Sequence, residues 1–328
     1  MRRMSMKVVL KLAIAAVILG LIALRVDFSA AFQLIGEANF FWFGAAIAIS
    51  LVIIIADAAF WSSAMGAVGL SLTFRSALLF GVAGWFFINV APSTVGADLF
   101  RAAQMRAAGA TTERAIRLVS AARLMSFASL IAVIGVGLPF AFKAFESAGD
   151  RIALGVIFAA AAAAFAGLVV FGPRLADTAL ARNAKPVLFA GLLASDLRTL
   201  LMKTPANGWL FLTVQHLCRI AGVVFAARAV GVEADLPAFF ALVPAAFLAA
   251  MAPITIGGWG VREASFVYFL GVAGVDAHAA LATSILFGLT RILIGLAGGL
   301  VWLAARSDRF KIAIDTPGPG DGEVRTKA

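Results

Sequence analysis

Long apolar stretches dominate this sequence and restrict the folds open to it. Six of them run over about 8–24, 40–62, 115–141, 152–171, 207–231 and 279–305. All but the first reach the roughly 20 residues that a helix needs to cross about 30 Å of hydrocarbon. Hydrophobic residues make up 62% of the chain and charged residues only 13%, so lipid must be the solvent for most of its surface. The sequence predicts an all-α, multi-pass membrane protein and excludes most soluble enzymes.

The stretch 8–24 follows a basic N-terminus and is open to two interpretations. It is either a cleaved signal peptide or an uncleaved first span, and the spans that follow it favour the second. With it, we expect about six full spans.

Two further apolar regions, 76–108 and 237–275, are interrupted in the middle by proline and glycine. Their pieces are too short to cross a bilayer at 1.5 Å per residue. Irregular backbone survives at membrane depth only where protein or a wet cavity surrounds it. We therefore predict two re-entrant helical hairpins. Their predicted hinge residues are Pro92, Gly96, Pro253, Gly257, Gly258 and Gly260.

The two interrupted regions share one spacing. Gly96 and Arg101 follow Pro92 at +4 and +9, and Gly257 and Arg262 follow Pro253 in the same way. We interpret this as an internal repeat, with repeat 1 over about 40–141 and repeat 2 over about 207–305. The alternation of spans predicts that the two repeats are inverted relative to each other. In transporters, broken helices in such repeats mark the substrate site.

The formal net charge of +10 lies in short clusters, which argues for topology signals and against a nucleic-acid surface. The segments 63–75 and 172–206 are basic and predicted to be cytoplasmic, as are both termini. The segments 25–39, 142–151 and 232–236 are neutral to acidic and predicted to lie outside. Within 1–311, predicted to be one integral membrane domain, an amphipathic cytoplasmic helix is expected over about 187–203. Residues 312–328 are expected to form a flexible tail.

Two motifs resemble those of a known family. The run Pro253-Ile254-Thr255-Ile256-Gly257-Gly258-Trp259-Gly260-Val261-Arg262-Glu263 resembles a signature of the lysylphosphatidylglycerol synthase transmembrane family. Asn89, Pro92, Gly96, Asp98 and Arg101 resemble its first motif, although Ser93 and Ala97 replace glycines usual there. The resemblance implies lipid handling in a bacterial inner membrane without the soluble aminoacyltransferase domain of the two-part synthases. Stand-alone relatives include hopanoid-associated membrane proteins.

Charged residues inside the spans are the candidate site. Arg219 and Arg291 fall near mid-span, where each costs about 2.5–3.5 kcal/mol on insertion scales. Together with Arg101 and Arg262 they are predicted to bind an anionic lipid headgroup. Asp98 and Glu263 are predicted either to orient the arginines or to contact a cationic headgroup. The alternative is that the arginines and carboxylates only neutralise one another. Asp57 and Arg123 lie nearer the inner ends of their spans, and His216 is one turn from Arg219.

These features predict a lipid translocase that moves an anionic or amphiphilic lipid. The alternative is a membrane scaffold that presents a lipid to a separate lipid-modifying enzyme. No catalytic constellation is visible, so we expect no enzyme activity, no cofactor and no metal. One cysteine, Cys218, excludes an internal disulfide. The sequence does not distinguish between candidate lipids, and it leaves the oligomeric state open.

Overall fold

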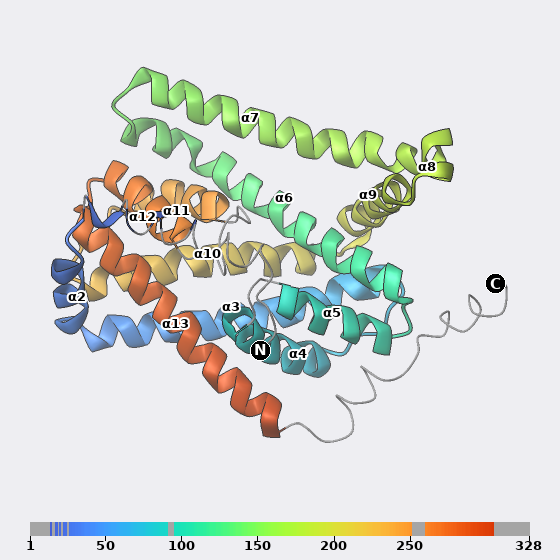
Figure 1. Cartoon of the computed structure of the whole chain (residues 1–328), viewed down its shortest axis with the longest axis horizontal. Coiled ribbons are helices and arrows are strands. Elements are labelled where there is room, and N and C mark those ends of the chain that lie inside the picture. Colours follow the sequence, from blue (N-terminus) through green and yellow to red (C-terminus); the bar gives the residue numbers. More distant parts are fainter. Residues whose placement is uncertain are drawn as a thin grey trace.

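The computed structural model describes residues 26–90, 95–250 and 260–304, together with positions 14, 17, 18, 20 and 22–24. These residues form helices joined by short turns, and no strand occurs among them (Figure 1). The all-α prediction is confirmed for this part of the chain. The predicted hinge residues Pro92, Pro253, Gly257 and Gly258, and the predicted tail 312–328, lie outside the described residues.

In the described part of the chain, five helices are long and apolar enough to cross a membrane. They are α3 (Phe40–Ala67), α6 (Thr112–Ala144), α7 (Ala148–Phe171), α10 (Ala206–Ala229) and α13 (Ala277–Ala304). Each coincides with one of the predicted spans, which confirms a multi-pass membrane protein. The remaining predicted span, 8–24, lies mostly outside the described residues, so the total of six stays a prediction.

Two pairs of shorter helices are each enclosed in sequence by two of the long helices, one pair between α3 and α6 and the other between α10 and α13. They are α4 (Phe74–Val90), α5 (Val95–Ala107), α11 (Leu236–Ala250) and α12 (Val261–Val272), with lengths of 17, 13, 15 and 12 residues. At 1.5 Å per residue they extend over about 18–26 Å, less than the hydrocarbon core. Within each pair the two short helices pack against each other. The order long–short–short–long therefore occurs twice, in unit 1 (α3–α6) and in unit 2 (α10–α13).

The two units use the same turn at corresponding places. In unit 1, α3 and α5 each end two residues before a glycine of positive φ, Gly69 (78°) and Gly109 (97°). In unit 2, α10 and α12 end in the same way before Gly231 (82°) and Gly274 (80°). After each glycine, the next amide donates to the carbonyl five residues earlier, at 3.0 Å. This is the Schellman turn, which satisfies the last carbonyls of a helix and favours glycine.

The contacts between units follow one pattern. The α4 helix packs on α13, α11 packs on α6, and α3 packs on α10 (Figure 1). Glycines allow the close approach in both mixed pairs. A Cβ at Gly298 of α13 would lie 2.3 Å from the Val82 carbonyl oxygen of α4. A Cβ at Gly137 of α6 would lie 3.0 Å from the Ala241 Cα of α11. The last long helix of each unit therefore packs at a glycine against the first short helix of the other unit.

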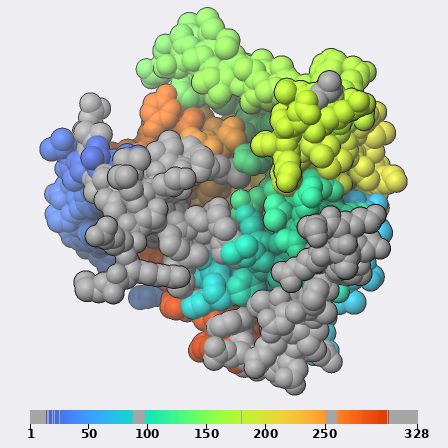
Figure 2. Space-filling view, turned by 45° about the vertical axis from the view of Figure 1, so that its right-hand side comes forward, coloured from blue at the N-terminus to red at the C-terminus, as the bar shows by residue number. Residues whose placement is uncertain are grey.

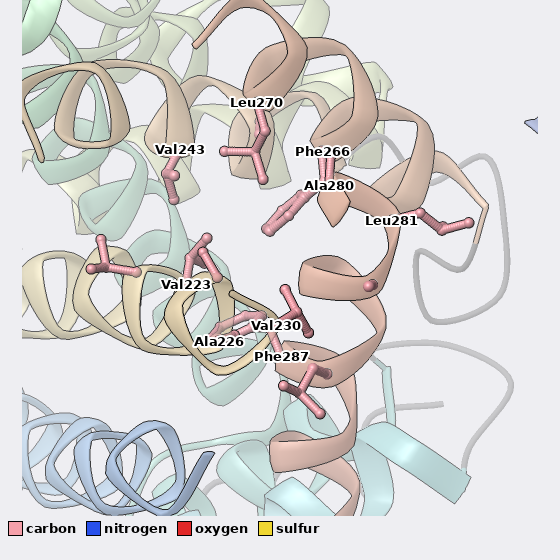
Figure 3. Packing of buried hydrophobic residues seen from close by; sticks show 14 of the residues in the cluster. Val223, Ala226, Val230, Val243, Phe266, Leu270, Ala280, Leu281 and Phe287 are labelled. Carbon is pink, nitrogen blue, oxygen red and sulfur yellow. The ribbon is translucent and has the colours of Figure 1, made fainter. Parts of the chain in front are cut away.

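Two apolar cores hold the helices together. In unit 2, Val223, Val243, Phe266 and Phe287 come from four different helices and join one cluster (Figure 3). The second core joins α3, α5, α6 and α10 to α9 (Lys185–Lys203), and Met65, Met105, Leu118, Leu197 and Leu212 belong to it. Full burial of a side chain of this size contributes about 1.5–3 kcal/mol relative to water. Both cores hold helices that carry the charged residues described below.

The α7 helix stands at the edge of the molecule, where it forms the green ridge in Figure 2. None of its residues is buried, and Phe158 against Gly135 is one of its contacts with α6. The chain then passes through η1 (Gly172–Asp177) and α8 (Ala179–Asn183) into α9. The buried residues of α9 are Gly191, Ala194, Leu197 and Leu200. At the opposite end of the spans, Asp27 caps the short helix α2 (Phe28–Gly36).

Candidate functional site

Five arginines from five helices form an arginine cluster between the two units. They are Arg101 of α5, Arg123 of α6, Arg219 of α10, Arg262 of α12 and Arg291 of α13. Three carboxylates contact or face them: Asp57 of α3, Asp98 of α5 and Glu263 of α12. Both units contribute, because α3, α5 and α6 belong to unit 1 and the other helices to unit 2.

In unit 1, two ion pairs join three helices. The Arg101 Nη2 atom lies 2.8 Å from the Asp57 Oδ2 atom, and the guanidinium lies over the Trp61 ring at 5.1 Å from its centroid. The Arg123 Nη2 atom lies 2.9 Å from the Asp98 Oδ1 atom. Side chains of both pairs remain partly accessible. Charge-assisted contacts of this length hold α3, α5 and α6 in register at the site.

In unit 2, Arg262 and Glu263 form a buried pair at the start of α12, with only 6% and 2% of their surfaces exposed. The Arg262 Nε atom donates to Glu263 Oε1 at 2.9 Å, and the Gly260 amide donates to Glu263 Oε2 at 2.6 Å. Glu263 therefore satisfies one of the free amides at the helix N-terminus and one arginine. Gly260 has φ of 85°, which a side chain would disfavour.

The Arg262 guanidinium also lies directly against α13. A Cβ at Gly288 would come within 2.5 Å of its Nη2 atom, so a larger residue there would displace the guanidinium. This contact and the Glu263 pair fix Arg262 between α12 and α13. The geometry thus shows that Arg262 and Glu263 fix each other's position. This role is additional to the headgroup contact predicted for them.

Arg219 differs from the other cluster arginines. It lies within electrostatic reach of Asp57 and Arg101, but its side chain makes no hydrogen bond or ion pair with any described residue. The surrounding helices enclose its guanidinium, and yet part of the side chain remains accessible. Arg219 therefore offers donors to a ligand within the site.

Arg291 completes the connection through unit 2. It lies within electrostatic reach of Arg219, Arg262 and Glu263, and its Cζ atom is 6.0 Å from the Trp85 ring centroid of α4. The four arginines predicted from the sequence are thus brought into one network. Neighbouring charges run without a break from Asp98 and Arg123 to Arg262 and Glu263.

The remaining candidate residues separate into three groups. Gly96 lies in the first turn of α5, and Gly260 lies at the start of α12. The His216 Nε2 atom lies 3.2 Å from the Ser126 carbonyl oxygen, which bonds α10 to α6. Asp57 and Arg123 were left out of the predicted binding set although their charges in apolar spans were a visible signal. Within the described residues, no group of three or more metal-ligating side chains occurs.

A hollow lies at the far end of α10, outside the arginine cluster. It has a volume of about 430 Å³ and is lined by Trp42, Arg228, Gly231, Val232, Glu233 and Ala234. The Arg228 guanidinium lies 4.8 Å from the Trp42 ring centroid, and Trp42 stacks on Phe225. Arg228 is therefore an arginine of the same helix as Arg219 in a different environment.

A family model described as the lysylphosphatidylglycerol synthase TM region matches residues 8–299. The chain belongs to this family. The match contains both units and all five cluster arginines, so it confirms the resemblance seen in the two motifs. No curated protein matches the chain significantly. Membership indicates a lipid-related role in a membrane, and it leaves the activity of this member to be argued from the site.

Proposed function

We propose that this protein is a lipid translocase of the bacterial inner membrane and that the arginine cluster binds the headgroup of its lipid. The observation that carries the proposal is Arg219, an enclosed arginine whose donors no described residue takes up. An arginine at membrane depth costs about 2.5–3.5 kcal/mol, and a bound anionic headgroup offsets that cost. A guanidinium also suits phosphate, because its planar fork can donate two parallel hydrogen bonds.

The arrangement of the units supports a route for the headgroup. Arg101 and Asp57 belong to unit 1, Arg262 and Glu263 belong to unit 2, and Arg219 and Arg291 lie between these pairs. In the proposal the units are inverted repeats, α4–α5 and α11–α12 are re-entrant, and both termini are cytoplasmic. Rocking of one unit against the other then exposes the headgroup to each leaflet in turn, while the lipid tails stay in the bilayer.

The test is transbilayer lipid movement in vesicles that contain the purified protein. A membrane-impermeant reagent destroys the fluorescence of labelled anionic phospholipid in the outer leaflet. The further loss of fluorescence from labelled lipid that began in the inner leaflet then reports movement across the bilayer. We expect movement well above that in protein-free vesicles, and Arg219→Gln should lower it about 10- to 100-fold. That range corresponds to the 1.5–3 kcal/mol of a hydrogen bond to a charged group.

Arg228→Gln is the matched control, because it removes an arginine from the same helix but outside the cluster. It should leave movement near the wild-type rate. Equal losses of lipid movement in both variants would show that Arg219 is not part of the binding site. Movement no faster than in protein-free vesicles would contradict the translocase and favour a scaffold that presents lipid to another enzyme.

A further inference from the structure

Asp57 and Arg219 occupy corresponding positions in the two units. The Schellman turn at Gly69 follows α3, and the same turn at Gly231 follows α10. Asp57 lies 12 residues before Gly69, and Arg219 lies 12 residues before Gly231. One position of the repeated fold therefore carries a carboxylate in unit 1 and a guanidinium in unit 2.

The helices that carry these two residues lie side by side and antiparallel (Figure 1). At one end, the Ser63 hydroxyl of α3 donates to the Asn207 side-chain oxygen of α10 at 3.0 Å. At the other end, the amide of Asn39, the N-cap residue of α3, donates to the Ala229 carbonyl oxygen at 2.8 Å. These two contacts fix the register of α3 against α10.

This register brings the two side chains toward each other. Asp57 lies level with about position 213 of α10, and Arg219 is about six residues further along, or about 9 Å at 1.5 Å per residue. Side chains on a helix lean toward its N-terminus, so on antiparallel helices these two side chains lean across that gap from opposite ends. Arg219 accordingly lies within electrostatic reach of Asp57.

Asp57 thus lies between two arginines on different helices. It contacts Arg101 of α5 at 2.8 Å, and it faces Arg219 of α10 without a hydrogen bond. The α3 and α10 helices pack along their lengths, whereas α5 packs mainly on α4 and α6. In the rocking motion of the proposed function, withdrawal of α5 from α3 would break the Arg101 contact and leave Arg219 beside Asp57.

We propose that Asp57 is a positioning residue that alternates between the two arginines and thereby controls release of the headgroup. While α5 is in place, Asp57 holds Arg101, and Arg219 is available to the lipid. When α5 withdraws, Asp57 pairs with Arg219 and displaces the headgroup. This inference rests on the proposed function for the release step, whereas competition for Arg219 concerns binding alone.

The chemistry of the two acceptors makes the competition direct. A carboxylate and a phosphate use the same donors, because both accept two parallel hydrogen bonds from the planar fork of a guanidinium. Asp57 is attached to the neighbouring helix, so its effective concentration beside Arg219 exceeds that of a lipid that must diffuse into the site. A buried arginine that bound its lipid without such a competitor would release it slowly.

The binding test uses purified protein in detergent and a fluorescent short-chain phosphatidylglycerol, whose affinity is measured by fluorescence anisotropy. Arg101→Gln frees Asp57 to take Arg219, so we expect binding to weaken about tenfold, as for loss of one hydrogen bond to a charged group. Arg101→Gln/Asp57→Asn removes the competitor and should restore the affinity to near the wild-type value. Arg101→Gln/Asp57→Glu keeps a carboxylate and should bind as weakly as Arg101→Gln.

The control for the second substitution is Arg101→Gln/Asp196→Asn, because Asp196 pairs with Arg117 outside the cluster. It should bind as weakly as Arg101→Gln alone. If Arg101 only contacts the headgroup directly, Asp57→Asn will not restore the affinity, and that result overturns the inference. Asp57→Asn alone, in which Arg101 is retained, should bind the lipid at least as tightly as wild type. Weaker binding by this folded variant would also overturn the inference.

The transport test uses the same lipid in vesicles. Asp57→Asn should bind phosphatidylglycerol but move it about tenfold more slowly than wild type, because the competitor that releases the headgroup is missing. Movement at the wild-type rate would overturn the release role. If wild-type protein moves lipid no faster than protein-free vesicles do, the translocase fails, and the affinities in detergent still decide whether Asp57 competes for Arg219.

Discussion

Each carboxylate of the cluster holds one arginine in place, and in the proposed function Arg219 binds the ligand. Its importance could be predicted from the sequence, because an arginine near the middle of an apolar span stands out by its cost. The partner of Arg101 could not, since Asp57 lies 44 positions earlier on another helix. Sequence spacing within one helix does not report which side chains of two helices meet.

The Arg101–Asp57 pair should stabilise the fold. Asp57→Asn leaves the Arg101 charge without its partner, and we expect a loss of about 1–3 kcal/mol, because side-chain exposures of 17% and 14% leave little room for water to replace it. Thermal unfolding in detergent measures this. The double variant Asp57→Asn/Arg101→Gln should recover part of the loss. A double variant that loses the sum of the two single effects would show that the side chains are not coupled.

Gly288 should be essential for the position of Arg262. Gly288→Ala would place a methyl group within 2.5 Å of the guanidinium and should cost about 1–3 kcal/mol through displacement of the buried pair. Gly66→Ala is the control, because nothing lies within 4 Å of its added Cβ. The apparent melting temperature should fall only for Gly288→Ala. A similar fall in both variants would mean that helix glycine itself, not the Arg262 contact, is responsible.

At the scale of helices, length and apolar content were sufficient to locate the long spans, and interruption by proline and glycine located the short helices. The structure adds the partners of each helix. The contact of α4 with α13 depends on Gly298 and the Val82 carbonyl, which are 216 positions apart and share no local sequence signal. The apolar sequence of α7 likewise does not show which of its sides meets the neighbouring helices. None of its residues is buried.

Helix approach at Gly298 gives a prediction for α13. Gly298→Ala would bring a Cβ to 2.3 Å from a backbone oxygen that cannot rotate away, so α4 and α13 must separate. We expect lower stability in detergent and slower lipid movement. Gly167→Ala in α7 meets nothing within 4 Å and should change neither. Normal stability of Gly298→Ala would show that the two helices are not held at this distance.

For the whole molecule, the repeated spacing around Pro92 and Pro253 predicted two corresponding units, and the structure shows the same order of helices in both. The matching Schellman turns were harder to foresee, because a glycine in a sequence does not show its φ value. The arginine cluster joins the units only in three dimensions. Its residues come from segments nearly 200 positions apart, so sequence could supply the candidates but not the network.

Labelling can test the proposed inverted orientation of the two units. Thr73 and Glu233 follow the corresponding turns at Gly69 and Gly231, so they should lie on opposite sides of the membrane. In a Cys218→Ala background, a membrane-impermeant maleimide should label Glu233→Cys in intact cells and Thr73→Cys only after the cells are opened. Labelling of both from the same side would exclude inversion.

The pairing of α3 with α10, α4 with α13 and α6 with α11 has a consequence for the origin of the chain. A two-fold axis between the units would produce this pattern, because α11 is the counterpart of α4 and α6 is the counterpart of α13. A gene for a single unit could therefore have specified every contact between the units through a dimer of identical copies. The fusion of two such genes would then have allowed the two units to diverge in sequence. In unit 1 the arginine pairs with an aspartate of a neighbouring helix, and in unit 2 the arginine pairs with the next residue of the chain.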